Sequence, residues 1–209
     1  MLAKFLPVFL SMFIMMDPIG LVPLYIGITA LNTAEEKKRI IRKAVCIAFI
    51  LSCFFTIAGK YILELLQIES GSFYIAGGIT LFIVALEMLF GRTTATKVSA
   101  RQPQDDEQRV SVAIFPLAIP MLVGPGTITT IILFTSEDSG GLSVMLMLFT
   151  AIVLVLIIVY LMLSASDLIL KRLGRTGVTV LERIMGMLLS GMAVQFVYDG
   201  LLKLNVVNG

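Results

Sequence analysis

The chain has 209 residues, a formal net charge of +2 and no histidine. Hydrophobic residues make up 58% of the chain, charged residues make up 14%, and the mean hydropathy is +1.00. A soluble core of this size cannot hide so much apolar surface, so the composition predicts a polytopic membrane protein that lies in a lipid bilayer. The small net charge argues against a nucleic-acid partner. Because histidine is the usual metal ligand, we expect no metal and no cofactor.

Six stretches of the sequence are apolar enough to cross a bilayer, since a span needs about 20 predominantly apolar residues. Backbone in lipid must satisfy its own hydrogen bonds, which predicts that every span is helical. In chain order the stretches cover residues 5–31, 40–60, 72–90, 111–135, 142–166 and 178–202. The expected fold is therefore all-α, with six transmembrane helices.

The first stretch is interrupted near its middle by Asp17, Pro18, Ile19 and Gly20. Proline lacks the N–H that would bond to the carbonyl four residues earlier, and the residue before it is pushed out of helical geometry. We expect a half-helix to end at Asp17 and the carbonyl of Ile14 to lose its helical partner. A carboxylate at the centre of a span costs about 2.5 to 3.5 kcal/mol, so Asp17 needs a partner. That partner is a substrate ammonium, a coupling ion, a proton, or the amides near Gly20 that its side chain can cap.

The fourth stretch carries a matching interruption, formed by Gly124, Pro125, Gly126 and Thr127. Here Pro125 is expected to leave the carbonyl of Met121 without its helical partner. We expect the glycines of both interruptions to let the chain turn. Broken helices in both halves of a chain are typical of secondary transporters.

The two interruptions are expected to meet near the middle of the membrane. Bare carbonyls at one half-helix end suit cations and bare amides at the next suit anions, so the predicted ligand is a small zwitterion such as an amino acid. The predicted substrate-binding residues are Asp17, Pro18, Gly20, Gly124, Pro125, Gly126 and Thr127. A coupling sodium ion or proton is expected at Asp17 and at the carbonyls of Ile14 and Met121. The structural alternative is that these prolines and glycines only kink helices or allow close packing.

The two halves of the sequence resemble each other at a shift of about 108 residues. This shift pairs Gly78 with Gly186, Ala85 with Ala193 and, at 107 residues, Pro18 with Pro125. Three spans per half place the second half upside down in the membrane. The predicted architecture is therefore two inverted three-helix repeats with broken first and fourth helices. The repeats are expected at residues 1–91 and 110–209, with a cytoplasmic linker at 92–109.

Positive charge is unevenly distributed between the two sides of a six-span arrangement. Thirteen of the sixteen Lys and Arg residues fall on one side, whereas the other side holds Lys4, Lys60 and Lys203. Lysine and arginine are enriched in cytoplasmic loops. Both termini are therefore expected on the extracytoplasmic side.

Four segments look like the signatures of the MarC family: residues 16–23 (MDPIGLVP), 75–79 (IAGGI), 120–128 (PMLVGPGTI) and 183–186 (RIMG). The resemblance covers essentially the whole chain. It implies a six-span protein of the cell inner membrane, related to small neutral amino acid transporters that handle glycine and alanine in some archaeal members. Binding residues do not come from this resemblance and rest on the backbone argument above.

These features together predict a secondary transporter of a small neutral amino acid that works by alternating access. The sequence has no phosphate-binding loop for ATP, so coupling to sodium or protons is the expectation. An exporter of another small metabolite, a channel, and a membrane protein without a transport role remain as alternatives, and a homo-oligomer is left open. An enzyme is not expected, because there is no histidine and Asp17 has no second acid at the same depth.

Overall fold

The computed structural model describes residues 2–30, 32–90, 117–136 and 141–206. These residues form helices and no strand, which confirms the all-α prediction. The elements are α1 (Leu2–Met16), α2 (Leu21–Ile28), α3 (Ala34–Leu66), α4 (Ser70–Phe90), the π-helix η1 (Leu117–Leu122), α7 (Pro125–Ser136), α8 (Gly141–Ser164) and α9 (Ser166–Lys203). The predicted linker at 92–109 lies outside the described residues, as does the first part of the predicted fourth span.

Within the described residues, five segments are long and apolar enough to cross a membrane. They are Phe5–Ile28, Ala34–Gly59, Gly71–Phe90, Leu142–Ser164 and Thr176–Lys203. Each corresponds to one of the predicted spans, and the first runs through both α1 and α2. The second part of the predicted fourth span is the shorter apolar helix Gly126–Thr135. The chain is thus a multi-pass membrane protein.

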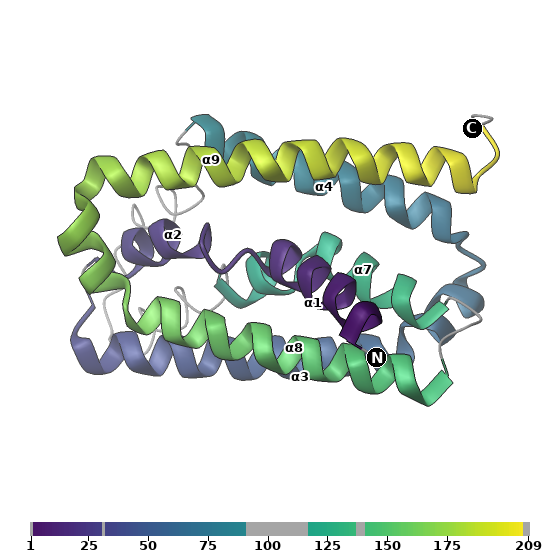
Figure 1. Ribbon diagram of the computed structural model, residues 1–209, viewed down its shortest axis with the longest axis horizontal. Helices are drawn as coiled ribbons and strands as arrows, with labels where there is room; N and C mark the ends of the chain where they lie inside the picture. The colour runs from purple at the N-terminus through teal and green to yellow at the C-terminus, as the bar shows by residue number, and fades with distance from the viewer. Residues whose placement is uncertain (1, 31, 91–116, 137–140, 207–209) are drawn as a thin grey trace.

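The helices lie in three layers, as Figure 1 shows. Helices α4 and α9 form one outer layer, α3 and α8 form the other, and α1, α2 and α7 lie between them. The first residues of α1 and the last residues of α9 lie at the same end of the molecule. The short, broken helices are therefore enclosed between two layers of long ones.

Buried apolar side chains form two separate clusters. The larger cluster joins α1, α2, α3, η1, α7 and α8. The smaller one joins α4 to α9 and includes Met15 of α1. Since no buried residue belongs to both clusters, the layer made by α4 and α9 is packed mainly on itself. A boundary between two packed units runs past the broken helices.

Small residues let α4 and α9 approach each other closely. A Cβ atom added to Gly78 would lie 2.7 Å from the carbonyl oxygen of Ala193, and one added to Gly186 would lie 3.0 Å from that of Ala85. Close approach of backbones at glycine and alanine is the usual basis of helix packing in membranes. Any larger residue at these positions has to push the two helices apart.

Helix α9 is kinked at Gly174, which has φ +66° and ψ 176°. Residues with positive φ are almost always glycine because a Cβ atom is not tolerated well there. The segment before the kink crosses the end of the helical layers (Figure 1). It is held there by an ion pair of 2.8 Å between Asp167 and Lys37 of α3. The membrane-spanning part of α9 begins after the kink, at Thr176.

Candidate functional site

The first interruption separates α1, which ends at Met16, from α2, which begins at Leu21. Asp17 has φ +39°, a conformation that aspartate and asparagine adopt more readily than most side chains. Its carboxylate accepts a hydrogen bond of 3.0 Å from the N–H of Gly20. The side chain is buried, with 8% of its surface exposed. The prediction that a half-helix ends at Asp17 is confirmed, and of the partners left open for its side chain the structure shows the amide of Gly20.

Gly20 lies in the turn between α1 and α2, as predicted, but it does not supply a backbone conformation that only glycine adopts. Gly20 has φ −68° and ψ −22°, which are ordinary right-handed helical values. Among the described glycines only Gly174 has a positive φ. Gly20 instead provides space: a Cβ atom there would lie 2.6 Å from Cε of Met88 and 2.7 Å from Cγ of Asp17. At this interruption the unusual conformation belongs to the aspartate.

The second interruption departs from regular helix at two places, before Pro120 and before Pro125. Helix α7 begins at Pro125, and the N–H of Ile128 bonds to the carbonyl of Gly124 at 2.9 Å. The chain already leaves helical geometry at Ile119, which has φ −133° and ψ 123°. This residue precedes Pro120, and a residue before proline disfavours the helical region. The chain therefore leaves regular helical geometry at Ile119, within η1, and again at Val123 and Gly124, before α7.

The hydroxyl of Thr127 connects the two interruptions. It lies 3.1 Å from the carbonyl oxygen of Leu122 and 3.4 Å from that of Met15, and it donates to these acceptors. Leu122 is the last residue of η1, and Met15 lies in the last turn of α1. The Thr127 side chain is 1% exposed. The two interruptions thus meet inside the protein.

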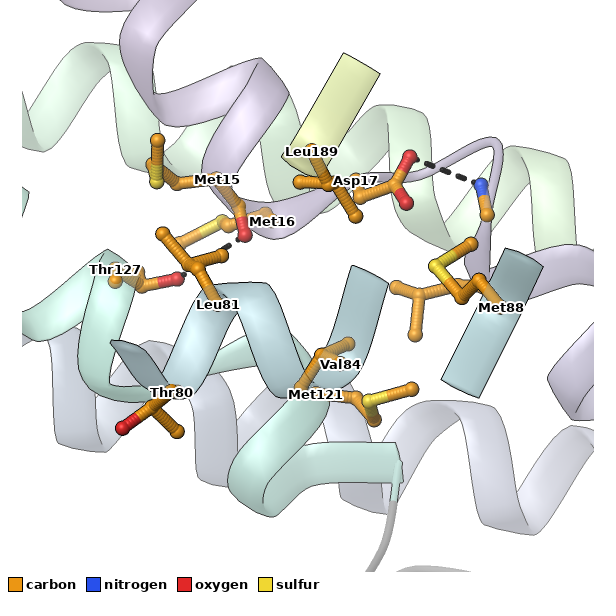
Figure 2. Close-up of a pocket in the computed structure, with 14 residues that line it drawn as sticks. Met15, Met16, Asp17, Thr80, Leu81, Val84, Met88, Met121, Thr127 and Leu189 are labelled. Atoms are coloured by element: carbon orange, nitrogen blue, oxygen red, sulfur yellow. Dashed lines mark hydrogen bonds between the residues drawn. The ribbon is translucent and has the colours of Figure 1, made fainter. Parts of the chain in front are cut away.

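A small cavity of about 50 Å³ lies where the interruptions meet (Figure 2). Its residues come from both interruptions and from the layer made by α4 and α9. They are Met15, Met16, Asp17, Gly20, Leu21, Thr80, Leu81, Val84, Met88, Met121, Gly124, Gly126, Thr127 and Leu189. The cavity lies at the boundary between the two buried clusters described above, because Leu81, Met88 and Leu189 belong to the smaller one.

Most of the predicted site residues are brought together at this cavity. Asp17, Gly20, Gly124, Gly126 and Thr127 line it, and so does Met121. Two predicted residues are placed differently: Pro18 is buried without lining the cavity, and Ile14 is half-buried and does not line it. Pro125 is the first residue of α7.

Sequence reasoning missed the side of the cavity that α4 and α9 provide. Leu81, Val84 and Met88 of α4 lie on one face of the helix, at spacings of three, four and seven residues. This spacing is the pattern of a helix face that contacts other parts of the protein. It could not be recognised in the sequence, because α4 is apolar on every side and the pattern does not distinguish a cavity face from a lipid face.

The cavity is mainly apolar and contains few polar groups. Besides backbone atoms, they are the carboxylate of Asp17 and the hydroxyls of Thr80 and Thr127. Thr80 donates its proton to the carbonyl of Ala76 at 2.9 Å. Among the described residues, an ion pair joins Lys37 and Asp167, and none involves Asp17. Nor do these residues contain a group of three or more His, Cys, Asp or Glu side chains that could hold a metal ion.

Sequence comparison connects this architecture to other membrane proteins. The chain is 34% identical over 197 residues to a UPF0056 membrane protein of Pyrococcus horikoshii, covering 94% of each chain. It is 36% identical over 200 residues to one of Aquifex aeolicus, covering 96% of this chain and 93% of that protein. A third relative, the UPF0056 membrane protein YhcE of Escherichia coli, is 28% identical over 193 residues and covers 92% and 89%.

No solved structure matches this chain. The sequence profile described as MarC family integral membrane protein matches residues 2–205, which include both interruptions and all the described helices. The chain therefore belongs to the MarC family of integral membrane proteins.

Proposed function

We propose that this protein is a secondary transporter of small neutral amino acids of the glycine and alanine type. It works by alternating access, and its substrate binds in the cavity between the two interruptions. One observation carries the proposal: two broken helices from opposite halves of the chain meet at a shared cavity and are joined there by the Thr127 hydroxyl. Transporters place their substrate sites at such meeting points of discontinuous helices.

The chemistry of the cavity suits a zwitterion. One carboxylate oxygen of Asp17 accepts the Gly20 amide, and the second oxygen lies over Gly20, where an added Cβ atom would collide with it. That second oxygen is the acceptor for a substrate ammonium. Amides in the first turn of a helix lack intrahelical acceptors and favour anions. The first turn of α7, with Gly126 and Thr127 at the cavity, therefore suits a substrate carboxylate.

The volume of the cavity favours a small ligand. A water molecule needs roughly 10 to 15 Å³ of such space, so the cavity of about 50 Å³ holds about four water-sized groups. Glycine and alanine are close to this size, and amino acids with long side chains exceed it. The apolar remainder of the lining matches a substrate whose side chain is absent or a single methyl group.

The packing of α4 on α9 supports two inverted repeats. In the proposed repeat, Gly78 corresponds to Gly186 and Ala85 corresponds to Ala193. The contact of Gly78 with Ala193 then has a counterpart in the contact of Gly186 with Ala85. Both contacts are present. Likewise α7 packs on α4 as α2 packs on α9. We assign the six proposed spans accordingly, with η1 and α7 in the fourth.

The orientation proposed from the sequence fits the placement of the chain ends. The start of α1 and the end of α9 lie at one end of the molecule, away from the basic residues at the start of α3 (Figure 1). We propose that the basic end faces the cytoplasm. Uphill transport is proposed to be coupled to sodium or protons, with Asp17 and the backbone near Met121 as the groups at the cavity that attract a cation.

Uptake into proteoliposomes tests the proposal. Purified protein is reconstituted, and accumulation of labelled glycine and alanine is measured with an imposed sodium gradient, a proton gradient or neither. Saturable accumulation driven by one gradient is expected, and liposomes without protein serve as the blank. Flux that rises linearly with concentration indicates a channel. Absence of uptake by folded protein overturns the substrate class and favours an exporter of another metabolite.

A further inference from the structure

Two side chains of α4 each lie against a glycine of one interruption. An added Cβ atom on Gly126 would lie 2.7 Å from Cδ1 of Leu81, and one on Gly20 would lie 2.6 Å from Cε of Met88. Figure 2 shows Leu81 next to Thr127, and Met88 next to the hydrogen bond between Asp17 and Gly20. One helix thus reaches both interruptions with two apolar side chains.

The two side chains lie on one face of α4. Leu81 and Met88 are seven residues apart, which places them about 10 Å apart along the helix axis. Both are buried, with 8% and 4% of their surface exposed, and both line the cavity. They occupy the space that the missing side chains of Gly126 and Gly20 leave open.

We propose that Leu81 and Met88 are the specificity-determining residues of this site and that they set the upper size limit of its substrate. The inference rests on the proposed function. Asp17 and the first turn of α7 hold the charged groups of the amino acid, so its side chain has to point toward the apolar part of the lining. Leu81 and Met88 leave room there for little more than a methyl group.

The two side chains differ in how firmly they set this limit. Leucine is branched and has few low-energy rotamers, whereas methionine is unbranched and adapts its shape to what it contacts. A larger substrate can displace the end of Met88 more easily than it can displace Leu81. Shortening Leu81 therefore has the larger effect on selectivity.

The experiment measures competition for labelled glycine uptake in proteoliposomes by unlabelled alanine, valine and leucine. One methylene in an apolar pocket changes discrimination by about 10-fold or more. We expect Leu81→Ala to improve competition by valine relative to alanine by at least about 10-fold, and Met88→Ala to improve it less.

Matched controls separate selectivity from packing. Leu148→Ala and Met12→Ala remove the same atoms from fully buried side chains that do not line the cavity. They are expected to lower thermal stability without changing the order of competitors. Because the chain has no tryptophan, stability is followed by calorimetry or with a thiol-reactive dye. Where Leu81→Ala does not fold, Leu81→Val gives a smaller change in the same direction.

The outcomes distinguish this inference from the proposed function. In one outcome the unmodified protein takes up glycine, but the order of competitors is unchanged in folded Leu81→Ala and Leu81→Val. This outcome overturns the role of Leu81 and Met88 and leaves the proposed function standing. The same shift in both the control variants and the α4 variants also overturns that role. Absence of uptake by the unmodified protein overturns the proposed function together with the inference.

Discussion

Thr127 joins the two halves of the molecule through a hydroxyl that lies 3.4 Å from the carbonyl oxygen of Met15. The same hydroxyl lies 3.1 Å from the carbonyl of Leu122, and one proton serves both acceptors. Two backbone carbonyls that proline-containing breaks would leave poorly satisfied are thus held by a single side chain. Movement of one interruption relative to the other must change this contact.

Replacing Thr127 by valine tests this connection. Valine keeps the shape of threonine but loses the hydroxyl, so the net loss of stability is expected to be about 1 kcal/mol and substrate affinity is expected to fall. Thr127→Ser keeps the hydroxyl and should bind substrate with the affinity of the unmodified protein. Thr56→Val is the matched control, because Thr56 is also buried but donates only within its own helix, to Ser52. Equal affinity in all three variants would contradict a role for the Thr127 hydroxyl in the site.

Asp17 combines a cap with a charge, and two substitutions separate them. Asparagine can accept the Gly20 amide and tolerates positive φ, so Asp17→Asn should fold and keep most of its stability while losing transport. Asp17→Ala should lose transport and also about 1 kcal/mol of stability, because the cap is removed. Uptake and calorimetry on both variants provide the measurement. Uptake at the normal rate in Asp17→Asn would show that the charge has no part in transport.

The positions of both interruptions can be predicted from sequence because proline acts locally. The missing N–H of Pro18 and its effect on Asp17 follow from covalent structure alone, and the structure places the end of α1 at Met16. The capping by Asp17 is local in the same sense, since it involves an amide three residues away.

Other parts of the site depend on packing between distant segments. Nothing near Gly126 in the sequence indicates that Leu81 lies against it. Gly20 looks like a turn residue, yet it is needed because Met88 and the Asp17 carboxylate fill the space beside it. The side of the cavity that α4 and α9 provide could not be predicted for this reason: α4 is apolar all round, and its partner faces are fixed only by the folded structure.

Adding a methyl group at Gly126 provides a test of its contact with Leu81. The three atoms nearest to a Cβ atom there all belong to the Leu81 side chain, at 2.7, 2.9 and 3.2 Å. Gly126→Ala alone should therefore destabilise the protein, and Leu81→Ala should relieve this in the double variant. Melting temperatures of the single and double variants give the coupling. Additive losses would mean that the backbone, not Leu81, restricts this position.

Gly20 makes the contrasting prediction. A Cβ atom there would meet the carboxylate of Asp17 as well as Cε of Met88, and the carboxylate is fixed by its hydrogen bond to the Gly20 amide. Met88→Ala should therefore fail to rescue Gly20→Ala. Full rescue of stability would show that the Asp17 side chain can move aside, which conflicts with its role as a fixed cap.

The contact between α4 and α9 should be the part of the fold most sensitive to added volume. Gly78→Ala places a Cβ atom 2.7 Å from the carbonyl oxygen of Ala193, and this neighbour is backbone that cannot rotate away. We expect a lower melting temperature and, because the proposed repeat relates Gly186 to Gly78, a similar loss for Gly186→Ala. Gly191→Ala is the control on the same helix, since nothing lies within 4 Å of its added Cβ atom. Alanine is favoured over glycine in a helix by about 1 kcal/mol, so this variant should be as stable as the unmodified protein or more stable. A loss at Gly191 equal to that at Gly78 would indicate a general effect of substitution in α9 rather than a tight interface.

The orientation of the chain is tested by labelling from one side of the membrane. In a background without Cys46 and Cys53, single cysteines are introduced at Lys38 and at Asn205, two exposed positions near opposite ends of the helical layers. A membrane-impermeant maleimide should label Asn205→Cys in intact cells, because the C-terminal end is proposed to face away from the cytoplasm. Lys38→Cys should react only after the membrane is permeabilised, since it lies among the basic residues that favour the cytoplasmic side.

The reverse pattern would invert the topology, and it would require the basic end of α3 to lie on the side where positive charge is normally depleted. Labelling of both positions in intact cells would instead place the two ends on one side and contradict the proposed path of α3 through the membrane.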